Sequence, residues 1–120
     1  MKGFMDLTRT ELEVMETLWK LESKMKQPQL LQVFEANGKS WKRQTLNTFL
    51  TRLENKGLVK REKGFVEPVY NRREFGYRQM KLAIEYLFDG SLCDMVLAYT
   101  ERGAIKKKEA KELIRILENC

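Results

Sequence analysis

The stretch WKRQTLNTFLTRLENKGLVKRE, residues 41–62, decides the fold. Its first part predicts a helix that starts after Trp41 and runs to about Lys56, because apolar residues recur at intervals of three and four. Gly57 follows the last turn, at a position where glycine commonly ends a helix. We expect the apolar side of this helix to face the core; it consists of Leu46, Phe49, Leu50 and Leu53.

The opposite side of this helix has an unusual composition. At 100° per residue it carries amides and hydroxyls, where an ordinary surface helix would carry pairs of Glu and Lys. Amides and hydroxyls are groups that contact base edges in the major groove of DNA. Arg43 and Arg52 flank this face. Its polar side chains are Gln44, Asn47, Thr48, Thr51 and Asn55.

Two short extended segments follow the helix. Residues 58–63 alternate weakly between apolar and polar side chains, and residues 65–70 form a second segment. Gly64 lies between them, so the pattern predicts a two-stranded hairpin that turns there. Because proline lacks the N–H that a central strand must donate, Pro68 favours an edge position for the second strand.

Two further helices are predicted before the quoted stretch. Thr8 and Glu11 have the spacing of a capping box, in which each side chain binds the backbone N–H of the other residue. The helix that starts there continues to about Leu21. Pro28 suits the first turn of a second helix, and the Asn-Gly pair at 37–38 ends it.

The order helix, helix, helix, hairpin is that of a winged helix-turn-helix domain, which we place at residues 1–73. In such a domain the third helix enters the major groove, and we expect the hairpin, or wing, to lie over adjacent phosphates. Residues 74–120 again have helical periodicity, so the fold class is mainly α with a small β-hairpin wing. The residues expected to contact DNA are Lys42, Arg43, Gln44, Thr45, Asn47, Thr48 and Arg52 in the helix and Lys60, Arg61 and Lys63 in the wing.

The positive charge of the chain is concentrated on these elements. The 120 residues carry a net charge of +6. Residues 39–73 carry ten bases and three acids, a net +7, while residues 1–38 carry −1 and residues 74–120 carry a net charge of zero. A concentrated basic segment is typical of nucleic-acid binding, although a solvated surface has the same composition. A winged helix that contacts only protein is the alternative.

The composition disfavours catalysis and metal binding. The chain has no His, the commonest general base and metal ligand, and Cys93 and Cys120 are too few for a zinc site. It also lacks a glycine-rich phosphate loop. We therefore expect no enzyme activity, no cofactor and no metal. Uncharged runs reach only eight residues and no apolar segment lies near the start, so we expect no membrane insertion and a cytoplasmic location.

The C-terminal region, residues 74–120, presents apolar stripes on three predicted helices. These 47 residues are too few to bury the stripes alone, so the helices either pack on the first domain or pair with a second copy. A regulator that binds a small molecule between the two regions is a further alternative. The stripes include Leu82, Tyr86 and Leu87, then Leu92, Met95 and Val96, and finally Leu113, Ile116 and Leu117.

Several motifs taken together resemble the penicillinase repressor family over residues 7–118. This family includes the repressors of β-lactamase and methicillin-resistance genes and copper-responsive repressors. The matching pieces are Leu7-Thr8 with Glu11, Val14, Met15, Leu18 and Trp19, then Trp41 and residues 45–54, residues 56–61, Tyr70 at the end of the wing, and Phe88-Asp89-Gly90-Ser91 between two C-terminal helices.

The resemblance implies a homodimeric transcriptional repressor. In this family the winged helix binds a palindromic DNA operator and the C-terminal helices form the dimer interface, which assigns the nine apolar residues named above to dimerisation. Some members are cleaved in the middle C-terminal helix after a membrane-bound sensor protease is triggered. The matching place here is Ala98-Tyr99, where β-lactam-responsive members have Asn-Phe. The Cys-x-Cys pair of copper-responsive members is missing.

Overall fold

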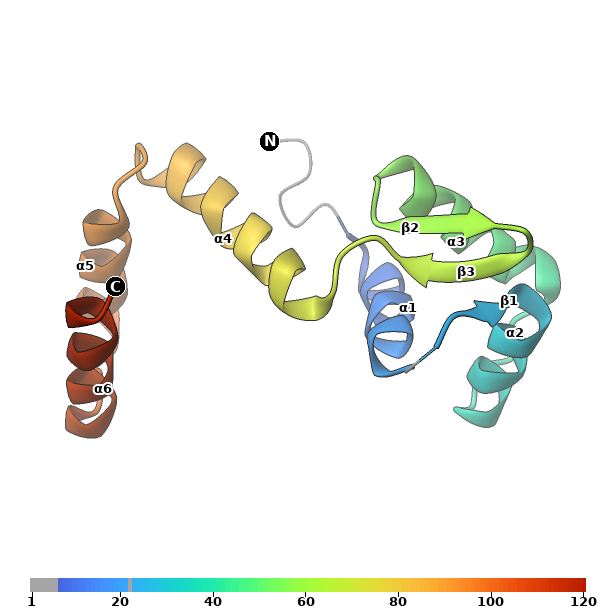
Figure 1. The fold of residues 1–120 in the computed structure, drawn as a ribbon, viewed down its shortest axis with the longest axis horizontal. Helices are drawn as coiled ribbons and strands as arrows, with labels where there is room; N and C mark the ends of the chain where they lie inside the picture. The colour runs from blue at the N-terminus through green and yellow to red at the C-terminus, as the bar shows by residue number, and fades with distance from the viewer. Residues whose placement is uncertain (1–6, 22) are drawn as a thin grey trace. The chain divides into compact units, whose positions relative to one another are not determined.

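The computed structural model describes residues 7–21 and 23–120 and is mainly helical, as predicted (Figure 1). The winged-helix elements are α1 (Arg9–Lys20), β1 (Met25–Lys26), α2 (Gln27–Ala36), α3 (Arg43–Asn55), β2 (Val59–Glu62) and β3 (Phe65–Pro68). They are followed by α4 (Arg72–Leu87), α5 (Leu92–Arg102) and α6 (Lys107–Glu118). Helices and hairpin therefore occur in the predicted order.

The predicted capping box starts α1. The Glu11 N–H donates to Thr8 Oγ1 over 3.1 Å, and the Thr8 N–H donates to Glu11 Oε1 over 2.9 Å. Two backbone donors that the first helical turn leaves without partners are thus satisfied. Val14, Met15 and Leu18 lie on the inner side of the helix that starts there, where they are buried.

The core of the winged helix lies among α1, α2, α3 and the sheet. Leu30 and Phe34 of α2 are buried in it, and α3 contributes three of the four predicted apolar residues as fully buried side chains. Phe49, the fourth, is partly buried and packs against the same cluster. The complete buried cluster is Val14, Met15, Leu18, Leu30, Phe34, Leu46, Leu50, Leu53, Val59 and Val66.

The hairpin turns at Lys63 and Gly64 and forms the wing. Within the described residues, the sheet has the strand order β1-β3-β2 and both pairings are antiparallel. The prediction that Pro68 places its strand at an edge is therefore wrong, because β3 is central. Strand β1 pairs only with Phe65 and Val66, so Pro68 lies where β3 has a neighbour on the β2 side alone.

The first turns of α4 belong to the winged-helix unit. Trp19 Nε1 donates to the carbonyl of Tyr70 over 3.0 Å, and its ring lies 5.3 Å from that of the buried Phe75. The chain divides into two compact units within α4, between Met80 and Lys81. This division comes later than the functional boundary after residue 73 that the sequence predicts.

Candidate nucleic-acid interface

Helix α3 is held at both ends. Before it, the Trp41 ring packs between Phe34 of α2 and Phe49 of α3, with ring centres 4.7 and 5.1 Å away. After it, Lys56 Nζ forms an ion pair with the buried Glu11 carboxylate at 3.1 Å. Because these contacts fix the inner side of α3 on the core, its opposite side faces outward.

The outward face of α3 is the one that the sequence predicts to contact DNA. Gln44, Asn47 and Thr48 of this face are exposed, as is the neighbouring Thr45. The flanking cations Lys42, Arg43 and Arg52 are also exposed. The Thr48 hydroxyl donates to the Gln44 carbonyl one turn earlier, over 3.0 Å. The structure therefore places six of these predicted residues on α3 and the seventh, Lys42, at its N-cap.

A hollow of about 400 Å³ lies at the start of this face. It is lined by Gln27, Arg43, Gln44 and Asn47, so three amides and one guanidinium surround it. Gln27, the first residue of α2, was not among the predicted contact residues. No pattern in the sequence indicates this contact, because Gln27 is far from α3 along the chain. Only the folded structure brings the start of α2 beside α3.

Arg61 occupies a different place from the one predicted for a wing residue. Its guanidinium turns back onto α3 and donates to Asn47 Oδ1 at 2.8 Å and Thr51 Oγ1 at 2.9 Å. It also forms an ion pair with Glu54 at 2.8 Å, and its side chain is only 22% exposed. The hydrogen bond from Arg61 lowers the pKa of the Glu54 carboxyl. Arg61 thus joins the wing to the polar face of α3.

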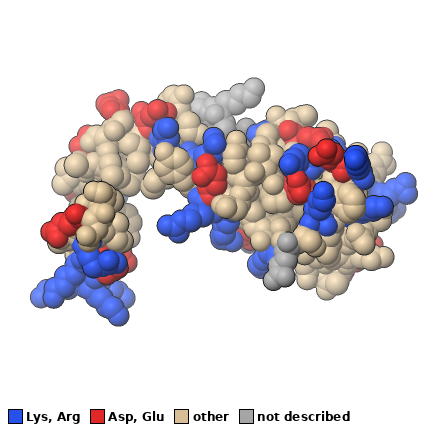
Figure 2. Space-filling model, viewed as in Figure 1, with Lys and Arg blue, Asp and Glu red and all other residues tan. Residues whose placement is uncertain are grey.

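The other two predicted wing cations point outward. Lys60 is exposed and pairs with Glu67 of β3 at 2.9 Å, which raises the pKa of Lys60 and lowers that of Glu67. Lys63 is exposed at the tip of the wing. Figure 2 shows cationic and acidic side chains interspersed over the hairpin. Carboxylates thus partly neutralise the positive charge of the wing on the face that Figure 2 shows.

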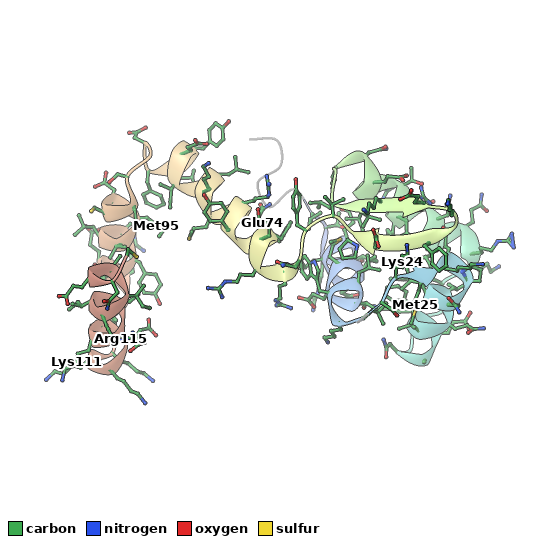
Figure 3. All side chains as sticks on the ribbon, viewed as in Figure 1. Lys24, Met25, Glu74, Met95, Lys111 and Arg115 are labelled. Atoms are coloured by element: carbon green, nitrogen blue, oxygen red, sulfur yellow. The ribbon has the colours of Figure 1, made fainter. Side chains whose placement is uncertain are left out.

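The residues predicted for dimerisation are mostly exposed in the single chain. Leu82 and Met95 are partly buried (Met95 is labelled in Figure 3), whereas the other seven are exposed. The sequence-based set missed further exposed apolar side chains in the same helices. An apolar surface of this extent is typical of an interaction site. The missed residues are Tyr77, Met80, Leu97 and Ile114.

The predicted cleavage position lies on α5. Ala98 is partly buried and Tyr99 is 65% exposed. Ser91 caps the start of α5, and its hydroxyl accepts the Asp94 N–H over 3.0 Å. The structure therefore places both residues within a regular helix.

Neither a metal cluster nor a membrane-spanning helix is found in residues 7–21 and 23–120. No group of three or more Cys, Asp or Glu side chains in these ranges is arranged to hold a metal ion. None of the helices there combines the length and the apolar character needed to cross a bilayer.

Three packed helices, a hairpin wing and an outward polar face on the third helix define a winged helix-turn-helix protein. The family model described as "Penicillinase repressor" matches residues 7–119, and the chain belongs to that family. A relative from Bacillus licheniformis described as "Penicillinase repressor" is 30% identical over 122 residues, which cover 98% of this chain and 94% of the relative. The predicted family is confirmed, and the family consists of transcriptional repressors rather than enzymes.

Proposed function

We propose that the protein represses transcription by binding a palindromic DNA operator as a homodimer, with α3 in the major groove. The observation that carries this proposal is the exposed polar face of α3, which is flanked by Lys42, Arg43 and Arg52. Its amides and hydroxyls supply donors and acceptors for base edges, while the cations bind phosphates and position the helix. Lys60 and Lys63 extend the phosphate contacts onto the wing.

The C-terminal helices support the dimeric part of the proposal. Exposed apolar residues occur on each of α4, α5 and α6, including Tyr86, Val96 and Leu117. A second copy of the same surface would cover them in a two-fold arrangement. A dimer would present two α3 helices to half-sites about 10 base pairs apart, or a multiple of this spacing.

Binding to duplex DNA tests the proposal directly. Duplexes selected by the protein from a random library are expected to bind more tightly than unselected duplexes in a fluorescence anisotropy titration. The affinity for both should fall steeply with salt, because cations that bind phosphates displace counterions. No binding to any duplex at micromolar protein and low salt would contradict the proposal and favour a winged helix that contacts only protein.

We also propose that repression is relieved by cleavage between Ala98 and Tyr99 after a membrane-bound sensor protease is triggered. The resemblance to cleaved family members and the exposure of Tyr99 on α5 support this. Mass spectrometry of the protein recovered from induced cells is expected to show a fragment that ends at Ala98. Recovery of only the intact chain while the repressed gene is transcribed would contradict cleavage.

A repressor that also responds to a small anion is a second candidate function. A cavity of about 650 Å³ lies in the winged-helix unit, next to the start of α4. Trp19 forms part of its wall, with the Arg72 guanidinium 5.7 Å from the ring centre, and Lys24 (Figure 3) lies over the Phe65 ring. The charged residues that line the cavity are Lys20, Lys24, Lys60, Arg72, Arg73 and Glu67.

The cavity therefore combines the Trp19 ring with an excess of cations, which suits an anion with a flat apolar part. Calorimetric titration with phenyl phosphate is expected to show binding that Arg72→Ala weakens. Lys111→Ala, which removes a cation of α6 outside the cavity, should leave the titration unchanged. Absence of binding at millimolar phenyl phosphate would contradict this second candidate.

A further inference from the structure

The contact between Arg61 and Asn47 determines which atoms Asn47 can present to a ligand. Arg61 Nη1 donates to Asn47 Oδ1 over 2.8 Å. A guanidinium has only donors, so the Asn47 amide must turn its oxygen towards Arg61. The Nδ2 group of the same amide points away from the guanidinium. Because Asn47 is exposed on α3, this NH₂ group is available to a partner outside the protein.

Three residues of α3 anchor the Arg61 side chain. Besides Asn47, Nη2 donates to Thr51 Oγ1 at 2.9 Å and to Glu54 Oε1 at 2.8 Å. A planar guanidinium held by a carboxylate and a hydroxyl keeps a fixed direction, which a flexible lysine ammonium would not. The orientation of Asn47 is therefore set before any partner binds.

We propose that Arg61 determines base specificity by holding Asn47 as a hydrogen-bond donor. This inference rests on the proposed function, in which α3 lies in the major groove. There guanine presents the acceptors N7 and O6, adenine presents N7 and thymine presents O4, whereas cytosine presents only its N4 amino donor. At the base that Asn47 contacts, guanine is expected to bind best and cytosine worst.

The preference differs from that of an unrestrained asparagine. A free Asn side chain pairs with adenine through both of its polar atoms, with its oxygen accepting from N6 and its nitrogen donating to N7. Because Arg61 takes one lone pair of Oδ1 and fixes the direction of the amide, the two-point contact with adenine is weakened and the preference for adenine falls. The hollow lined by Gln27, Arg43, Gln44 and Asn47 leaves space for the base edge beside this amide.

Arg61→Met tests the proposal, because it removes the donors and keeps much of the apolar stem. The probe is the duplex selected by the wild-type chain, with each base pair replaced in turn by the other three. Wild type is expected to bind guanine about tenfold more tightly than cytosine at one position, and Arg61→Met should largely abolish this difference. Circular dichroism of the variant confirms that it is folded.

Lys60→Ala is the matched control. Lys60 precedes Arg61 in β2 and carries the same charge, but its ion pair is with Glu67 on β3. Its removal is expected to weaken all duplexes by a similar factor and to leave the preference at the Asn47 position unchanged. Arg61→Lys gives a second test that conserves charge. Its ammonium is expected to pair with Glu54 and release Asn47, which also reduces the preference.

A double mutant shows whether Arg61 acts through Asn47. In an Asn47→Ala background, Arg61→Met is expected to weaken all duplexes equally, because no amide remains to be oriented. If Arg61→Met and Arg61→Lys both bind DNA with the wild-type base preference at the Asn47 position, the inference is overturned and the proposed function stands. Absence of DNA binding by the wild-type chain would overturn both.

Discussion

Glu11 is a buried carboxylate that joins two helices. Its side chain is 1% exposed, and its oxygens accept hydrogen bonds from the Thr8 N–H and from Lys56 Nζ. Burial alone raises the pKa of Glu11, but the bonds from Thr8 and Lys56 outweigh it and hold the pKa below its ordinary value. The start of α1 is thereby tied to the residue that follows α3.

Removal of this carboxylate should destabilise the winged helix. Glu11→Ala leaves the Thr8 N–H and the Lys56 ammonium without this acceptor, so we expect the free energy of unfolding to fall by about 1–3 kcal/mol. Urea denaturation followed by circular dichroism measures the change. Glu13→Ala, which breaks the more exposed pair with Lys39, is the control and should have a much smaller effect. Equal effects of the two variants would show that burial of Glu11 contributes nothing.

The same carboxylate should make stability depend on pH. Because the folded-state pKa of Glu11 lies below the ordinary value of 4.5, its contribution is present above that value. It is lost as pH falls through the folded-state pKa, where the carboxylate is protonated in both states. We expect the unfolding free energies of wild type and Glu11→Ala to differ most at neutral pH and to converge below pH 4.5. A difference that does not change with pH would contradict the assigned ionisation.

Two substitutions separate base contact from phosphate contact. Asn47→Ala should weaken binding to the selected duplex by about 1–3 kcal/mol and relax the preference at one base pair. Lys60→Ala should weaken all duplexes similarly and reduce the salt slope by about one unit. Anisotropy titrations at several salt concentrations measure both effects. Identical behaviour of the two variants on selected and random duplexes would disprove the assigned roles.

At the scale of the element, the wing tip combines a cation with an unfavourable backbone conformation. Lys63 has φ 53° and Gly64 has φ 82°. A two-residue hairpin turn with both φ values positive favours Asn-Gly, because asparagine tolerates this region better than lysine. The lysine therefore places a charge at the tip at some cost to the stability of the hairpin.

Lys63→Asn should separate these two properties. We expect it to stabilise the fold by up to about 1 kcal/mol, since the strained residue is replaced by a tolerant one. It should also lower the affinity for DNA and reduce the salt slope by about one unit. Thermal unfolding and anisotropy measure the two effects. Lys63→Arg, which keeps both the charge and the strain, should change neither, and an equal gain in stability from it would contradict the argument.

The sequence predicted the elements that local patterns mark clearly. The capping box, the apolar side of α3 and the glycine turn of the wing each follow from residues close together in the chain. Strand β1 was not predicted, because a two-residue strand has no period. The position of β3 in the sheet depended on that missing strand, so the rule for Pro68 wrongly predicted an edge strand.

At the scale of the whole molecule, the C-terminal helices leave a large apolar surface exposed in the single chain. Leu117 on α6 is 62% exposed. We expect Leu117→Glu to convert a dimer into a monomer, as measured by light scattering, and to weaken operator binding because two linked contacts become one. Lys111→Glu places the same side chain on the polar side of α6 (Figure 3) and should remain dimeric. A wild-type monomer would contradict the proposed dimer.

The sequence predicted where the candidate interface lies on the fold, but it did not predict the hydrogen bonds between the residues of that interface. Charge and composition identified the face of α3 and the wing, because these are properties of consecutive residues. The bonds from Arg61 to Asn47 and Glu54 were not predictable, since they require the angle between the wing and α3. Gln27 was missed for the same reason. The proposed dimer and operator come from the family resemblance, because a single chain displays neither.

The two tryptophans of the chain lie at different junctions. Trp41 packs against Phe34 and Phe49 just before α3, whereas Trp19 bonds to the Tyr70 carbonyl beside the start of α4. Indole emission responds to the polarity of its surroundings, and the chain contains two indole fluorophores. Trp19→Phe would leave only the indole emission from the α3 junction, and Trp41→Phe only that from the α4 junction. Events at the two places can thus be followed separately, without an attached dye.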